Sequence, residues 1–293
     1  MFEIRRDIGP FEECELIDHK ANSRVQVFPG RGGIITSFTI EGKELFYLEK
    51  DTILDTTRSV RGGNPILFPL CGGLPDDTYQ FKDISYKIKQ HGFGRTNAWK
   101  VTGEDTEDAA ILTIELTSDE TTLASFPFHF TVKYHYILKG NTLTIRQEYI
   151  NRGYIHDPEV AMPFATGFHP YFLATDKSKL QFDLPASQYV DHVSGEPSTF
   201  KGFPFEAPVI DWVFTDVHSP IAIVTNPTDG YRLTLKSENV YKYLVFWTLI
   251  GKDFFCLEPW TARRNALNTG TDLQYVPPRS SLTFEFSMVG ELL

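Results

Sequence analysis

Apolar and polar residues alternate along most of this chain, in short runs that end at glycine, proline, asparagine or aspartate. Alternation with a period of two is typical of β-strands with one buried face. A hairpin is expected where residues 130–138 and 142–150 flank a turn at 139–141. Further strands are expected at residues 23–29, 34–40, 44–48, 84–89, 111–116, 180–184, 222–225, 231–235 and 281–288.

Helical periodicity is scarce, and many short strands with frequent turn signals favour an all-β fold. We therefore expect a large antiparallel β-sandwich with few short helices. No repeat, low-complexity tract or linker divides the sequence, so residues 1–293 are expected to form one domain.

An acidic residue, Glu258, lies within the apolar run that begins at Phe254. In a strand, alternation places Glu258 on the same face as Phe254 and Cys256. A carboxylate on such a face loses hydration, which raises its pKa and makes it a stronger proton acceptor. The other interpretation is an ordinary strand-end glutamate paired with Arg263 or Arg264.

Proline and glycine mark segments that depart from the strand pattern. Pro259 cannot donate to a sheet ladder, so the strand is expected to end there or to lie at an edge. A turn-rich loop carries Arg61 and Asn64, which are suited to bind hydroxyls or an anion. Two glycines beside His91 leave room for a ligand to approach the backbone. His169 precedes a proline among aromatic residues, a setting that suits sugars.

The composition narrows the classes of partner. A hydrophobic fraction of 41% supports a large core, and a formal net charge of −10 argues against nucleic acid and an anionic membrane surface. Cys14, Cys71 and Cys256 are widely spaced and are expected to be reduced thiols. Without a visible signal peptide or membrane-spanning run, a cytoplasmic location is expected.

The candidate chemical groups are His91, His169, Asp211, Glu258 and Arg61. The zincin, P-loop and hydrolase-elbow motifs are missing. Two histidines and a glutamate could form a metal triad, but no close pair of ligands supports one. A metal-free acid/base pair is the simpler expectation.

Three blocks taken together resemble the signature segments of the aldose 1-epimerase (galactose mutarotase) family: QHGFGR at 90–95, GFHPYF at 167–172 and LEPW at 257–260. The block RGGNPILFP at 61–69 is similar to the substrate loop of the branch with hexose-6-phosphate mutarotases and LacX-like proteins. The resemblance spans nearly the whole chain. It implies a large antiparallel β-sandwich, in agreement with the strand pattern.

The resemblance also implies a reaction, the interconversion of the α and β anomers of an aldose without a cofactor. It makes Glu258 the base that removes the proton from the anomeric hydroxyl. It makes His169 the acid that protonates the ring oxygen. Acid/base chemistry of this kind requires both groups within roughly 2.6–3.2 Å of their target atoms.

Substrate-binding roles are implied for His91, Arg61, Asp211, Asn64 and Arg95. Two of these assignments leave alternatives open. Asp216 is close enough in sequence to be the true counterpart of Asp211, and Arg95 could instead brace its loop through an ion pair.

Three functions fit these observations. The first is an aldose 1-epimerase acting on a hexose. The second is a hexose-6-phosphate 1-epimerase, which is plausible if Arg58 and Arg61 both face the pocket and bind phosphate. The third is a non-catalytic carbohydrate-binding protein on the same scaffold, although pure binding would not need a matched acid and base. The expected partner is a small sugar or sugar phosphate, and the sequence predicts no oligomeric state.

Overall fold

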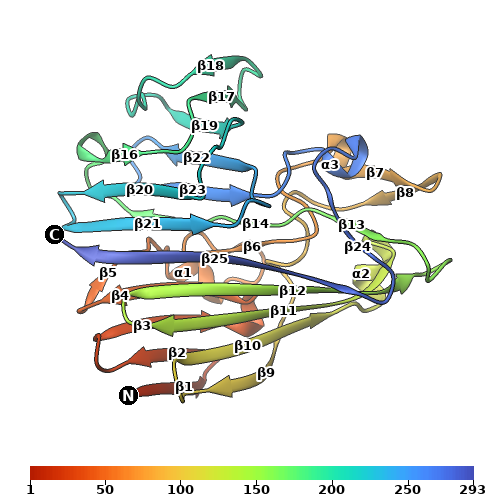
Figure 1. Cartoon of the computed structure of the whole chain (residues 1–293), viewed down its shortest axis with the longest axis horizontal. Helices are drawn as coiled ribbons and strands as arrows, with labels where there is room; N and C mark the ends of the chain where they lie inside the picture. Colours follow the sequence, from red (N-terminus) through yellow and green to blue (C-terminus); the bar gives the residue numbers. More distant parts are fainter.

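The computed structural model describes residues 1–293 and is built from antiparallel sheets (Figure 1). An eight-stranded sheet forms one layer, in the order β16-β20-β21-β25-β12-β11-β10-β9. Its strands are β9 (Lys100–Asp105), β10 (Ala110–Thr117), β11 (Phe128–Lys139), β12 (Thr142–Tyr154), β16 (Gln181–Asp183), β20 (Ile221–Asn226), β21 (Tyr231–Ser237) and β25 (Ser281–Leu292).

Two further sheets form the second layer. A five-stranded sheet contains β1 (Phe2–Ile8), β2 (Glu12–Asp18), β3 (Ser23–Phe28), β4 (Ile34–Ile40) and β5 (Lys43–Glu44). A second eight-stranded sheet contains β18 (Pro197–Thr199), β17 (Gln188–Asp191), β19 (Val209–Phe214), β22 (Tyr243–Leu249), β23 (Phe254–Trp260), β14 (Gly167–Phe168) and β6 (Ile66–Leu67), with β15 (Tyr171–Leu173) paired to β23.

Short elements connect these layers. The remaining strands form two-stranded ribbons, β7 (Thr78–Phe81) with β8 (Ile84–Lys87) and β13 (Met162–Phe164) with β24 (Gln274–Val276). The helices are α1 (Asp51–Leu54), α2 (Glu120–Ser125) and α3 (Ala266–Thr269), and the 3-10 turns are η1 (Pro29–Arg31), η2 (Pro75–Asp77) and η3 (Lys177–Lys179).

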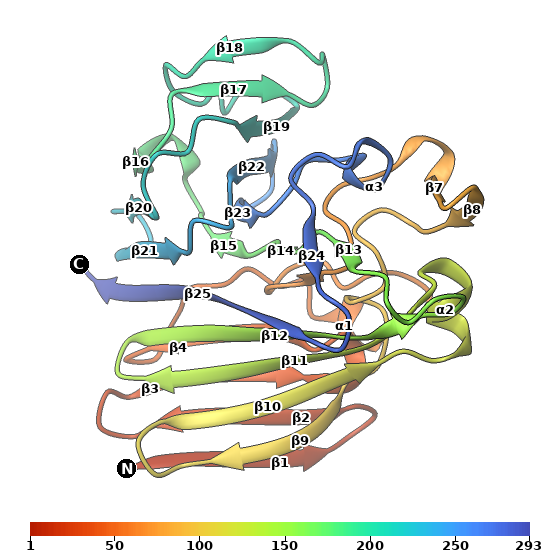
Figure 2. The same ribbon diagram turned by 45° about the vertical axis from the view of Figure 1, so that its right-hand side comes forward.

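The core lies between the two layers, and in Figure 2 strands β10–β12 of one layer lie in front of β2–β4 of the other. Every second residue of β10, from Ala110 to Leu116, is buried, so the first sheet presents one apolar face. The five-stranded sheet packs on this face through β2 and β3. The second eight-stranded sheet packs on it through Phe168, whose ring stacks on Phe286 at 5.1 Å between centroids. A bridge between Phe46 and Phe172 joins the two covering sheets.

The sandwich and the hairpin of β11 and β12 are confirmed. The strand expected at 44–48 is wrong in extent, because β5 ends at Glu44. The carboxylate of Glu44 accepts hydrogen bonds from the backbone N–H groups of Phe38, Leu45 and Phe46. The chain beyond Glu44 therefore turns toward the other covering sheet and makes only isolated bridges.

All three cysteines are buried free thiols, as expected. Among the helices, none combines the length and the apolar character that a membrane crossing requires.

Candidate active site

His169 and Glu258 face each other across a break in one ladder. Gly167 of β14 pairs with Trp260 of β23, and Tyr171 of β15 pairs with Cys256. His169 lies midway between the two pairs, so the antiparallel register places it opposite Glu258. His169 precedes a proline, which disfavours the helical conformation and keeps this segment extended.

This break also corrects the expectation for Pro259. The strand does not end there; β23 continues through Pro259 to Trp260. Pro259 pairs with Leu244 on one side, and no ladder pair opposes it on the β14–β15 side. A residue without an N–H is tolerated where the ladder is interrupted.

The two titratable groups are in direct contact. His169 Nε2 lies 3.3 Å from Glu258 Oε1. The other carboxylate oxygen, Oε2, accepts a hydrogen bond of 3.0 Å from Trp260 Nε1. Glu258 is 1% exposed and contacts neither Arg263 nor Arg264, so the strand-end ion pair considered from the sequence is wrong.

Burial suppresses charge on both groups. Loss of hydration, reinforced by the negative charge of Asp211, raises the pKa of Glu258 well above its usual range. Loss of hydration, reinforced by the positive charge of Arg95, lowers the pKa of His169 to about 3. Burial therefore opposes both the carboxylate form of Glu258 and the imidazolium form of His169.

His91 forms a second wall of the site. Its backbone has φ of 65°, a left-handed conformation that is uncommon outside glycine, and its N–H donates to Gly72 O at 2.8 Å. A Cβ at Gly92 would lie 2.1 Å from Phe68 O, so only glycine fits after His91. The imidazole packs edge-on to His169, with 5.7 Å between centroids, and burial lowers its pKa.

These groups open on a pocket of about 260 Å³. Both polar side chains and aromatic rings line it, as a sugar with hydroxyl edges and apolar C–H faces requires. The lining residues are Ser59, Val60, Arg61, Gln90, His91, Arg95, His169, Tyr171, Asp211, Val245, Trp247, Glu258, Trp260 and Arg264.

Trp247 is a pocket residue that the sequence reasoning missed, and Tyr171 was identified only as one of the aromatic residues around His169. The Tyr171 ring stacks beside His169 at 4.9 Å, and Trp247 lies edge-on to the same imidazole at 5.6 Å. A signal for Trp247 was present in the sequence. If residues 243–249 and 254–260 are paired as a hairpin, Trp247 falls opposite Cys256, on the face that carries Glu258.

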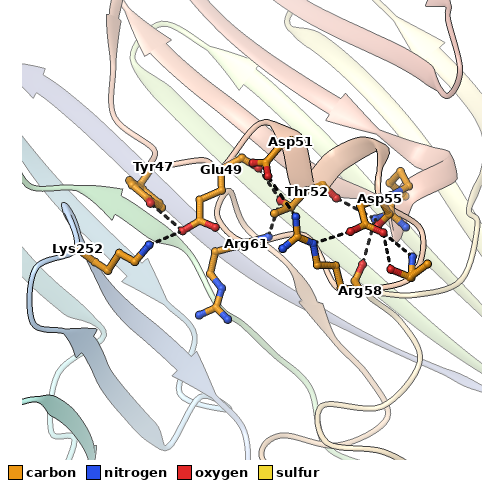
Figure 3. Close-up of polar contacts among 10 residues, drawn as sticks. Tyr47, Glu49, Asp51, Thr52, Asp55, Arg58, Arg61 and Lys252 are labelled. Atoms are coloured by element: carbon orange, nitrogen blue, oxygen red, sulfur yellow. Dashed lines mark hydrogen bonds and ion pairs between the residues drawn. The ribbon is translucent and has the colours of Figure 1, made fainter.

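The two arginines of the substrate loop differ in their surroundings (Figure 3). Arg58 Nε lies 2.7 Å from Asp55 Oδ2, and its Nη2 lies 3.2 Å from Asp51 Oδ2. The guanidinium of Arg61 extends away from these pairs, 6.0 Å from the centre of the Trp247 ring, and lines the pocket. The condition that both arginines face the catalytic pocket is therefore not met, because Arg58 lines an adjoining pocket instead.

A neighbouring carboxylate, Glu49, is also occupied. It accepts from Lys252 Nζ and from the Tyr47 hydroxyl, each at 3.0 Å (Figure 3). These contacts keep Glu49 from forming an ion pair with Arg61.

Arg95 lines the pocket, whereas Asn64 does not. Arg95 Nη2 donates to Gln90 O at 3.1 Å, and its buried Nε has no partner in the protein. The bracing ion pair considered for Arg95 is not formed. Asn64 is 1% exposed and pairs through its backbone with Ile35, so the structure does not bring its side chain to the pocket.

The structure separates Asp211 from Asp216. Asp211 lies on β19 and lines the pocket. The carboxylate of Asp216 accepts from the backbone of Ser187 and Gln188, so it holds a turn outside the pocket. His192, which the sequence reasoning missed, lies 2.8 Å from Asp211 Oδ1 through its Nδ1 atom.

One cluster has the composition of a metal site. Ligand atoms of His169, Cys256 and Glu258 lie within 4.8 Å of one another. Burial, with the nearby charge of Glu258, raises the pKa of the Cys256 thiol well above its usual range, which opposes the thiolate that a metal would need. The sequence-based expectation of a metal-free site stays a prediction.

Comparisons with known proteins identify the family of this chain. The family model described as aldose 1-epimerase matches residues 14–282. The LacX protein of Lactococcus lactis subsp. lactis (chromosomal form) is 24% identical over 249 residues, which cover 74% of this chain and 79% of LacX. A protein of Cenchrus ciliaris that is named for glucose-6-phosphate 1-epimerase is 25% identical, with 83% of this chain and 70% of that protein covered.

Solved structures show the same fold. The Slr1438 protein of Synechocystis sp. PCC 6803 superposes with a TM-score of 0.91 at 37% identity, covering 95% of each chain. A galactose mutarotase-like protein of Clostridium acetobutylicum superposes with a TM-score of 0.83 at 18% identity, covering 100% of this chain and 99% of that one. With a family model that spans almost all of the sandwich, this chain belongs to the aldose 1-epimerase family.

Proposed function

We propose that this protein is an aldose 1-epimerase that interconverts the α and β anomers of a hexose. The observation that carries the proposal is the 3.3 Å contact between His169 Nε2 and Glu258 Oε1 at a sugar-sized pocket. Anomer exchange needs an acid and a base at two oxygens that share one carbon. Two adjacent groups with one proton between them meet that requirement.

The proposed reaction conserves protons at every step. Glu258 takes the proton of the anomeric hydroxyl while the bond from C1 to the ring oxygen breaks. The ring oxygen keeps the bonding electrons and takes a proton from His169, and C1 becomes an aldehyde carbon. Rotation about the C1–C2 bond presents the other face, and the same transfers in reverse close the ring.

The shared proton explains how both directions can proceed. Ring opening in this scheme starts from the carboxylate and imidazolium form of the pair. Ring closure starts from the neutral form, which burial favours because it disfavours charge on both groups. One proton transfer along the 3.3 Å contact interconverts the two forms without exchange with solvent.

The remaining pocket residues are proposed to bind the sugar. Trp247 and Tyr171 offer rings on which C–H faces can stack. His91, Arg61 and Asp211 offer donors and acceptors for the hydroxyls. His91 also lies next to His169, where it can contact the reacting end of the sugar.

A second candidate function is the same reaction on a hexose 6-phosphate. Three arginines, Arg61, Arg95 and Arg264, line the pocket, which is more cationic than a neutral sugar requires. An adjoining pocket of about 440 Å³ shares Arg95, contains Arg31, Arg58, Lys87 and Lys89, and has no acidic residue in its lining. These cations favour an anionic group on the part of the substrate that projects from the catalytic pocket.

Exchange spectroscopy by NMR tests the proposal and separates the candidates. The wild-type protein should accelerate exchange between the anomers of D-glucose, D-galactose or D-glucose 6-phosphate above the spontaneous rate. A higher kcat/KM for the phosphate ester would identify the second candidate. Binding of all three sugars without acceleration would identify a carbohydrate-binding protein without turnover and would end both enzymatic proposals.

A further inference from the structure

We infer that His192 is a positioning residue that orients the Asp211 carboxylate toward a sugar hydroxyl. The inference rests on the proposed function. It adds a residue to the substrate-binding machinery that neither the sequence blocks nor the pocket lining includes. His192 acts through Asp211 and does not itself touch the sugar.

Two hydrogen bonds tie His192 to Asp211. His192 follows β17, and its backbone N–H donates to Asp211 O at 2.8 Å. Its side-chain Nδ1 lies 2.8 Å from Asp211 Oδ1. Since a carboxylate only accepts hydrogen bonds, this contact requires a proton on Nδ1 of His192.

The location of His192 fits a positioning role better than a surface contact. Its side chain is 3% exposed, and its ring stacks on Trp260 with 6.3 Å between centroids and 28° between planes. Trp260 in turn holds Glu258 through the bond from Nε1 to Oε2. His192 is therefore buried between Asp211, which it hydrogen-bonds, and the Trp260 ring, against which it packs.

The two oxygens of Asp211 have different roles in this proposal: Oδ1 is held by His192, and Oδ2 is the one that can accept from a sugar hydroxyl. Oδ1 is bound by His192, and Oδ2 lies 3.6 Å from Arg264 Nη2, a looser contact with a half-exposed side chain. Asp211 lies opposite Trp247 in the ladder between β19 and β22, beside the ring on which we propose that the sugar stacks. An acceptor fixed at that point can select a substrate with a hydroxyl at one position.

A pair of variants separates this role from simple packing. His192→Asn places an amide N–H near the position of Nδ1, whereas His192→Leu fills similar space without a donor. We expect His192→Leu to raise the KM for a sugar substrate about tenfold with kcat within about twofold, the change typical of losing a hydrogen bond to an ion. His192→Asn should recover most of the loss. His218→Leu makes the same change at an exposed histidine outside the pocket and should leave both constants unchanged.

KM values for a series of monodeoxy-D-glucoses distinguish a positioning role from a purely structural one, because only a positioning role makes the effect of His192→Leu depend on which hydroxyl is missing. For the one sugar that lacks the hydroxyl bound by Asp211, KM should be the same in wild type and His192→Leu. An equal KM penalty for every sugar, a fall in kcat with KM unchanged, or equal losses in the Asn and Leu variants would overturn the inference.

A measurement that needs no turnover keeps this inference separate from the proposed function. Long-range ¹H–¹⁵N NMR spectra of the wild-type protein should show a proton on Nδ1 of His192, the atom that faces Asp211 Oδ1. The opposite tautomer would overturn the positioning role even in an active enzyme. The Nδ1–H form in a protein that fails to accelerate exchange for any sugar would instead place the failure in the proposed function.

Discussion

Replacing Glu258 by glutamine removes the proposed base while changing little else. Glutamine has nearly the same shape, and its side-chain oxygen can still accept from Trp260 Nε1, as Glu258 Oε2 does at 3.0 Å. Its amide group would face His169 Nε2 in place of Oε1. The variant therefore keeps the local hydrogen bonds but cannot carry the proton.

The expected loss follows from the chemistry of one proton transfer. A positioned general base typically supplies on the order of 10²–10⁴ in rate, which corresponds to about 3–5 kcal/mol of barrier at about 1.36 kcal/mol per tenfold. We expect kcat for anomer exchange to fall by that factor, with KM changed less. Adding His169→Asn to Glu258→Gln should cost little more, because groups that act as a unit lose their effect together.

The stability of this variant can be predicted from the pKa of Glu258. Burial raises that pKa in the folded protein, so the wild-type chain loses stability as pH rises from the unfolded value of about 4.5 toward the folded one. Glutamine does not titrate. Glu258→Gln should therefore be at least as stable as wild type at neutral pH, with an advantage that grows as pH rises over this range.

Polarimetry of fresh α-D-glucose and NMR exchange, each corrected for the spontaneous reaction, measure the rate, and thermal unfolding measures the stability. Glu159→Gln, at an exposed carboxylate that pairs with Arg279, serves as the matched control and should behave as wild type. A folded Glu258→Gln protein with more than about a tenth of the wild-type kcat would refute the assignment of Glu258 as the base.

The other predictions concern pH and the cationic residues. Because the pKa of His169 is lowered to about 3, kcat/KM should not fall as the pH is lowered through 6.5, where a solvated imidazole titrates. A midpoint near pH 6.5 in the pH profile of kcat/KM would contradict the lowered pKa of His169. The same shift means that the folded state loses stability as pH falls from about 6.5 toward 3, and unfolding experiments on His169→Asn should show that dependence reduced. For an unphosphorylated hexose, Arg61→Ala should raise KM at least fivefold, or about 1 kcal/mol, in kinetic assays. Arg58→Ala should leave that KM unchanged, because Arg58 lies outside the catalytic pocket and is paired with Asp55 and Asp51. Equal effects of the two substitutions would contradict this distinction. Lys252→Met should also raise KM, because Glu49, no longer bound to Lys252, could form an ion pair with Arg61. Adding Glu49→Gln to Lys252→Met should restore the wild-type KM. A double variant with the same raised KM as the single variant would show that Lys252 and Arg61 do not compete for Glu49.

Local patterns predicted the layers of the fold and part of the site. The hairpin of β11 and β12 has clear alternation and a glycine in its turn, so the sequence carries its register. The same alternation placed Glu258 on one face with Cys256, as the structure confirms. The convergence of His169 with Glu258 came from the family resemblance, because no local rule predicts which distant strands pair.

The remaining features depend on contacts between distant segments. His192 meets Asp211 because β17 pairs with β19, a register that short polar-flanked strands do not specify from sequence. The sequence left open whether Arg58 faces the pocket, and the structure pairs it with two acids of its own loop, Asp51 and Asp55. Pro259 was expected to end a strand, and the interrupted ladder that accommodates it is visible only in three dimensions.

A crystal structure with a bound aldose tests the central claim most directly. The proposed function predicts that the anomeric oxygen lies within about 2.6–3.2 Å of Glu258 and the ring oxygen within the same distance of His169 Nε2. A sugar whose anomeric carbon lies toward Asp211 and Arg264, with a remote hydroxyl between His169 and Glu258, would contradict it.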